Sequence, residues 1–183
     1  MTTITTLSPY QHILASKIIE IAASKGLIID KFLESEDLSN LWTELGKLYL
    51  VDALGQFNDY PEVSIAWAAY LGLGAAHVWD KNWSPEISAK EFYCSMIEKR
   101  GFDAMDDFIT EELYNFKVES KKYREIKDLF LSTAHSSLKI MKNQNVEPMT
   151  KDSLNLFYET ISVFYILGVS LGLSLLGYKY TKI

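Results

Sequence analysis

The chain has 183 residues, of which 48% are hydrophobic and 23% are charged, as in an ordinary soluble globular domain. Its net charge of -6 argues against a nucleic-acid binder, because such proteins neutralise phosphates with a basic face. The single cysteine, Cys94, excludes an intrachain disulfide and fits a reducing cytoplasm. We therefore expect one cytoplasmic domain over residues 1–183, with residues 1–7 as a frayed lead-in.

Prolines and polar capping residues indicate where the helices begin. The first signal is Ser8-Pro9-Tyr10-Gln11, which combines an N-cap serine, a first-turn proline and a glutamine at the capping-box position. Strand signals are weak throughout the chain. We predict helices at about 9–25, 37–57, 61–81, 86–100, 103–115, 118–143 and 150–178, and a short helical turn over 28–34.

The glycines predict two kinds of structure. Gly26 and Gly101 each follow a cationic residue and precede an apolar one, which is typical of a helix C-cap. The other seven glycines each follow a leucine inside or at the end of an apolar helical pattern; they are Gly46, Gly55, Gly72, Gly74, Gly168, Gly172 and Gly177. Glycine is unfavourable in a helix, so these positions suggest close helix packing, with hinges or a ligand notch as alternatives.

The predicted fold class is all-α: a single-domain bundle of six or seven mostly antiparallel helices with a buried central hairpin. The hairpin consists of the helices at 37–57 and 61–81. Residues 65–76 are apolar on every side of the second helix, which indicates burial by several neighbours. We expect Gly168 and Gly172 of the last helix to pack against this glycine-rich helix.

The hairpin also provides the candidate ligand-binding residues. Asp52 falls on an apolar stripe of the first helix, opposite Trp67 and near Tyr70, whose N–H and O–H groups are candidate donors to its carboxylate. His77 falls opposite Trp42, too far from Asp52 to form a catalytic dyad. Asp52 is either a structural carboxylate that fixes the hairpin register or an acid facing a ligand in an aromatic pocket. His77 is either a core histidine or a catalytic base.

The sequence lacks the common catalytic and metal-binding motifs. It contains no Glu-x-x-His, no His-Glu-x-x-His, no G-x-S-x-G and no Walker A loop. We therefore predict neither catalytic residues nor a metal or other cofactor. The acidic run at 103–112 is interpreted as a solvated face beside the lysine-rich helix at 118–143, with a divalent cation or a basic partner as the alternatives.

The C-terminal segment raises a membrane alternative. Residues 161–177 contain no charged side chain and span about 26 Å as a helix, slightly less than the hydrocarbon core of a bilayer. Three serines lower the hydrophobicity of the segment. A buried core helix is the preferred interpretation, and a tail anchor is the alternative.

Three functional hypotheses follow from these observations. The leading one is a non-catalytic cytoplasmic protein that acts through contacts with a protein partner or as a homo-oligomer. The second is a small-molecule-binding protein or enzyme that uses the aromatic pocket on the hairpin. The third is a tail-anchored membrane protein, with residues 161–177 as the anchor.

Overall fold

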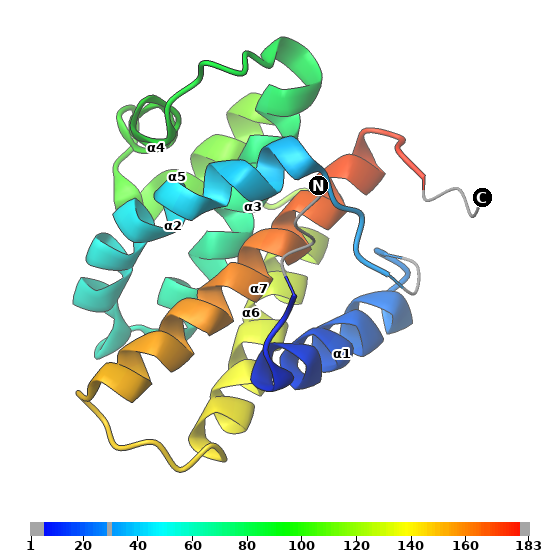
Figure 1. Ribbon diagram of the computed structural model, residues 1–183. Coiled ribbons are helices and arrows are strands. Elements are labelled where there is room, and N and C mark those ends of the chain that lie inside the picture. The colour runs from blue at the N-terminus through cyan, green and yellow to red at the C-terminus, as the bar shows by residue number, and fades with distance from the viewer. Residues whose placement is uncertain (1–5, 29–30, 180–183) are drawn as a thin grey trace.

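The computed structural model describes residues 6–28 and 31–179, and in these ranges every regular element is helical (Figure 1). The α-helices are α1 (Pro9–Ser24), α2 (Glu36–Phe57), α3 (Pro61–Asn82), α4 (Ala89–Ile97), α5 (Met105–Asp107), α6 (Lys121–Lys142) and α7 (Lys151–Leu175). A 3₁₀ turn, η1 (Phe102–Ala104), precedes α5, and a π-helix, η2 (Phe108–Leu113), follows it. The predicted all-α, single-domain bundle is confirmed.

The start of α1 follows the predicted chemistry. The Ser8 hydroxyl accepts a hydrogen bond from the Gln11 backbone N–H at 3.2 Å, and the Gln11 side chain accepts one from the Ser8 N–H at 3.0 Å. This capping box satisfies two N–H groups that have no partner within the helix. Of the predicted frayed lead-in, residues 1–5 lie outside the described residues, whereas Leu7 packs against the core.

Two predicted helix starts were wrong. The turn expected at 28–34 is not helical at residues 31–34, and residues 29–30 lie outside the described part. The fourth helix begins at Ala89 instead of residue 86, because Ser88 provides the cap: its hydroxyl accepts a hydrogen bond from the Glu91 N–H at 3.1 Å. Ser84 instead accepts a bond from the Glu86 N–H within the preceding loop.

The continuous helix predicted over 103–115 is broken into η1, α5 and η2. The Tyr114 N–H reaches back five residues to the Ile109 carbonyl at 3.3 Å, which is the hydrogen-bond spacing of a π-helix. The wider turn carries three consecutive buried side chains, Phe108, Ile109 and Thr110.

α3 and α7 form the centre of the bundle and run in the same direction. Residues 69–76 of α3 lie beside residues 168–172 of α7, and Figure 1 shows α7 passing diagonally through the molecule. A Cβ atom on Gly168 would lie 2.6 Å from the Ala69 carbonyl carbon, and one on Gly72 would lie 2.7 Å from the Val169 nitrogen. Both distances are shorter than real contacts, so the two backbones touch where only glycine fits. The predicted packing of the C-terminal glycines on α3 is confirmed.

Most of the other glycines also follow the prediction. Gly46 and Gly74 face side chains within 3 Å of an added Cβ, so packing explains them. Gly26 and Gly101 end their helices with φ values of 70° and 81°, as expected for C-caps. Gly177 was predicted to be a packing glycine, but it is a third cap with a φ of 93°.

Gly55 also contradicts the packing prediction, because no atom lies within 4 Å of an added Cβ. A glycine inside a helix costs about 0.5–1 kcal/mol relative to alanine, and the described fold gives Gly55 no compensating contact.

α7 is the one helix among the described residues that is long and apolar enough to cross a membrane, and 78% of its most apolar window is buried. Its buried serines have partners inside the protein. The Ser162 hydroxyl accepts from the Trp42 indole N–H at 2.8 Å, and the Ser170 hydroxyl accepts from the Leu33 backbone N–H at 2.8 Å. These contacts favour the core-helix interpretation of α7, since the serines satisfy donors of the protein interior.

α1 and α6 are antiparallel neighbours on one side of α7. The Lys25 ammonium group contacts the Asp128 carboxylate at 2.6 Å where α1 ends, while Ile13 near the start of α1 lies beside Ile140 near the end of α6. α2 lies against α3, α4 and α7 on the other side of the bundle (Figure 1).

Candidate functional site

The five residues proposed from the hairpin contact different parts of the fold. Trp42 faces α7, where its ring stacks on Tyr165 with 4.5 Å between the ring centroids. Its indole N–H is satisfied by Ser162. Trp42 is therefore an anchor between α2 and α7, and its buried polar atom already has a partner.

Asp52 was expected on a buried stripe, and this expectation was wrong. The residue is exposed on α2, and its carboxylate accepts a hydrogen bond from the Tyr93 hydroxyl of α4. Burial and this bond to Asp52 raise the pKa of the Tyr93 hydroxyl. Asp52 thus connects α2 to α4, whereas the expected donors lie on α3.

Trp67 and Tyr70 are in contact, with ring centroids 5.3 Å apart in an edge-on arrangement. The Trp67 indole N–H donates to the Phe102 carbonyl at 3.1 Å instead of to Asp52. His77 lies at the other end of α3, half-buried beside the Tyr114 ring. Burial, helped by the nearby Lys81 ammonium group, lowers the pKa of His77 against the opposing effect of Asp80. The ligand-binding role of the five residues stays a prediction.

A buried carboxylate that the sequence analysis placed on a solvated face lies between α5 and α6. Asp106 is 4% exposed, and its carboxylate is 3.7 Å from the Lys127 ammonium group. The Lys127 ammonium group donates to the Tyr123 hydroxyl at 3.1 Å, and that hydroxyl donates to the Asp107 carboxylate at 2.7 Å. The predicted proximity of the acidic segment to the lysine-rich helix is confirmed, but the solvated interpretation fails for Asp106.

The surroundings of Asp106 shift its carboxyl group toward the neutral form. Burial, reinforced by the charge of Asp107, raises the pKa of Asp106 from 3.8 to about 6, although Lys127 acts in the opposite direction. The cluster can exchange a proton in mildly acidic solution. The donors and acceptors named here are, however, paired with one another, so the arrangement is that of an internal structural network.

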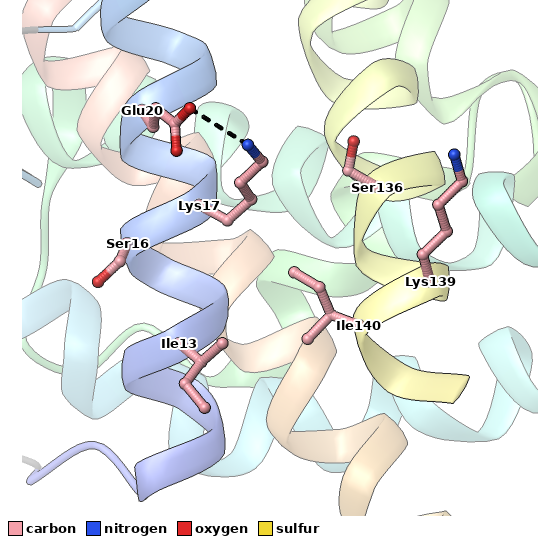
Figure 2. A pocket seen from close by; sticks show the side chains of 7 residues that line it. All are labelled: Ile13, Ser16, Lys17, Glu20, Ser136, Lys139 and Ile140. Carbon is pink, nitrogen blue, oxygen red and sulfur yellow. Dashed lines mark hydrogen bonds and ion pairs between the residues drawn. The ribbon is translucent and has the colours of Figure 1, made fainter. Parts of the chain in front are cut away.

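An open groove lies between α1 and α6, with a volume of about 580 Å³ (Figure 2). Its lining residues are Ile13, Ser16, Lys17 and Glu20 from α1, and Ser136, Lys139 and Ile140 from α6. Figure 2 shows the two isoleucines pointing into the gap from opposite helices. Ile13 is 57% exposed although it lies in the second turn of α1. This groove is a better candidate for binding than the hairpin.

The groove has apolar side chains at its centre and mainly basic charges along its walls. The Lys17 ammonium group is 3.2 Å from the Glu20 carboxylate. This ion pair is exposed, so water and salt screen the attraction between its charges. Lys139 on the opposite wall has no acidic partner within the described part of the chain. Such a combination suits a ligand with both an apolar strip and negative charge.

Sequence reasoning missed this groove because it depends on the spacing of two helices that are distant in the chain. The available signal was Ile13, an isoleucine that neighbours the core-facing Leu14 but lies outside the buried stripe of α1. Asp106 offered no such signal, because its burial depends on the packing of the short helix α5 against α3.

The described residues contain no group of three or more His, Cys, Asp or Glu side chains placed to hold a metal ion. In comparisons with known proteins, the chain matches no family model, no curated protein and no solved structure.

Proposed function

We propose that this chain is a non-catalytic protein that acts through protein–protein contacts, by binding an amphipathic, acidic helix of a partner protein in the groove between α1 and α6. The observation that carries the proposal is the exposed Ile13 side chain facing Ile140 across that groove. Apolar side chains exposed together in a concave surface are typical of interaction sites.

The shape of the groove supports a helix as the occupant. Two antiparallel helices leave a furrow along their length, and a third helix can pack into it by placing its ridge of side chains between theirs. Residues 13–20 cover about two helical turns, or roughly 10 Å. A partner helix would therefore insert two or three apolar anchors spaced by three or four residues.

The charges support an acidic partner. Lys17 and Lys139 flank the isoleucines from opposite walls, and Glu20 already neutralises part of the charge on Lys17. Carboxylates beside the apolar anchors of a partner helix would face these lysines. Because the contact is short, we expect a weak interface with a dissociation constant on the order of 10–100 µM.

A displayed library of 16-residue helical peptides tests the proposal. Peptides are selected on the wild-type chain and counter-selected on Ile13→Asp, which introduces a charge at an exposed position of the groove. We expect the enriched peptides to carry apolar residues three or four apart, flanked by Asp or Glu. Fluorescence anisotropy should then show at least tenfold weaker binding to Ile13→Asp and to Lys139→Glu.

Val51→Asp is the matched control, because Val51 is 73% exposed on α2, outside the groove. This variant should bind the selected peptides as the wild type does. Enrichment of basic peptides, or of peptides that bind Ile13→Asp as tightly as the wild type, would refute the proposal. So would a selection in which no enriched peptide depends on Ile13.

The proposal includes a cytoplasmic location. Cys94 is a free thiol on the surface, which suits a reducing compartment.

A further inference from the structure

Residues 102–116, which contain η1, α5 and η2, are joined to α3 by a hydrogen bond near each end. At the start, the Phe102 carbonyl accepts from the Trp67 indole N–H at 3.1 Å. Near the end, the Tyr114 hydroxyl donates to the Leu73 carbonyl at 2.6 Å. We call residues 102–116 the clasp segment, because it lies across α3 between these two points.

The middle of the clasp segment carries the buried carboxyl group of Asp106, which is 4% exposed. Titratable groups face this carboxyl group from each neighbouring element: Asp107 from α5 itself, Tyr123 and Lys127 from α6, and Tyr70 from α3. The Lys127 ammonium group is 3.7 Å away, which is too far for a direct hydrogen bond. The ionised carboxylate is therefore only partly compensated for its loss of water.

The backbone of the clasp segment is irregular. A 3₁₀ turn, three α-helical residues and a π-helix take the place of one continuous helix. Such turns have poorer hydrogen-bond geometry than a regular α-helix, and π-helical turns are frequent at functional sites. The ion pair between Arg100 and Glu112, which joins η2 to the chain after α4, is partly exposed and screened by water. A segment with these properties can open locally while the rest of the bundle stays folded.

We propose that the clasp segment is a pH-sensitive latch, which stays closed on α3 when Asp106 carries a proton and opens locally far more often when Asp106 is ionised. The closed segment holds the ionised carboxylate away from water and beside the like charge of Asp107, whereas the open segment hydrates it. Lys127 offsets only part of this cost. Opening also uncovers Met105 and Ile109, which are fully buried when the latch is closed, so the ionised state presents an apolar surface.

The pKa of Asp106 sets the pH range in which the latch responds. This pKa is about 6 in the closed segment, and the ordinary value of 3.8 applies to a carboxyl group exposed in the open segment. Because the open form loses its proton at lower pH, the ratio of open to closed forms rises with pH until Asp106 is ionised in both. With these two pKa values, the ratio increases about twentyfold between pH 4.5 and pH 7.5.

Native-state hydrogen exchange followed by NMR measures this opening. The reporters are the backbone N–H groups of Tyr114 and Phe116, which donate to the Ile109 and Thr110 carbonyls at 3.3 and 3.0 Å. After correction for the intrinsic exchange rate at each pH, their protection should fall about twentyfold between pH 4.5 and pH 7.5. Low concentrations of urea should leave this exchange nearly unchanged, because local opening exposes much less surface than global unfolding does.

Three variants test the assignment to Asp106. Asp106→Asn keeps the shape of the side chain without its charge, so the protection of the same N–H groups should change by less than about twofold over this pH range. Lys127→Met removes the ammonium group that opposes the raised pKa of Asp106, so the fall in protection should extend to higher pH. Lys121→Met is the matched control on α6, because Lys121 is 90% exposed, and it should leave the pH range unchanged.

Three results would overturn the proposal. They are a protection that does not change with pH, a pH dependence that survives in Asp106→Asn, and reporters whose exchange depends on urea as steeply as that of the buried N–H groups of α7. The latch does not rest on the proposed helix binding, since none of its residues lines the groove between α1 and α6. Peptide binding in the groove should persist in all three variants, so failure of one proposal is distinguishable from failure of the other.

Discussion

Replacing Gly168 with alanine tests the contact on which the centre of the bundle depends. The new Cβ would lie 2.6 Å from the carbonyl carbon of Ala69 and 2.9 Å from its Cα, whereas carbon atoms in contact prefer about 3.5 Å or more. The obstructing atoms belong to the Ala69 backbone, so no side-chain rotation relieves the overlap. The two helices must separate by about 1 Å.

The cost of this separation follows from the packing between α3 and α7. A gap of about 0.5–1 Å forfeits a quarter to a half of the dispersion energy of each contact that it opens. Overpacking a well-packed core typically costs about 1–3 kcal/mol. Because every contact along this interface opens together, we expect the loss for Gly168→Ala to be at or above ~3 kcal/mol, a large part of a typical folding free energy.

A graded series separates packing from helix propensity, which favours alanine by a similar amount at each site. Gly55→Ala meets no atom and should stabilise the fold by about 0.5–1 kcal/mol. Gly172→Ala meets the Ala76 methyl at 2.6 Å and the Tyr114 hydroxyl at 2.8 Å, and the hydroxyl can move, so its effect should be intermediate. Urea unfolding followed by far-UV circular dichroism measures all three. A Gly168→Ala variant within 1 kcal/mol of wild type would refute the reasoning.

Three further predictions concern the buried acid, the first cap and the last helix. The folded state binds the Asp106 proton more tightly than the unfolded chain, because its pKa is about 6 instead of 3.8, so this group lowers stability as the pH rises from about 4 to 6. Asp106→Asn should remove that contribution. In urea unfolding, the variant should be more stable than wild type at pH 7 by up to ~3 kcal/mol. A variant that is less stable than wild type at pH 7 would contradict the prediction. Ser8→Ala should lower the free energy of unfolding by about 1 kcal/mol in the same assay. An unchanged free energy would show that the cap is dispensable. A chain truncated to residues 1–160 should lose its cooperative unfolding transition, whereas a soluble, well-folded truncation would favour the membrane anchor.

Local chemistry made several parts of this structure predictable from the sequence. Ser8 and Gln11 lie three residues apart, so their capping box needed no tertiary information. Gly26 and Gly101 could be identified as caps from their neighbours alone. The uniformly apolar segment 65–76 predicted a helix surrounded by others, since such a surface is stable only when it is covered.

The candidate sites were less predictable, because they depend on how distant elements are placed. Periodicity put Asp52 on the stripe that faces α3, but in the structure its carboxylate lies outward, within reach of Tyr93 on α4. Asp106 is buried in the short helix α5, which packs against α3, and no composition rule indicated this burial. The groove exists because α1 and α6, which are distant in the chain, lie side by side, although each helix looks ordinary by itself.

The sequence by itself determined the helices, most of their ends, and the two apolar segments that had to be buried, because these follow from backbone hydrogen bonding and apolar periodicity within a few residues. The tertiary structure alone decided that α3 and α7 run in the same direction, which glycines touch a backbone, and which side chains remain exposed in the groove. These features depend on distances between helices, and such distances are set by the packing of the whole core at once.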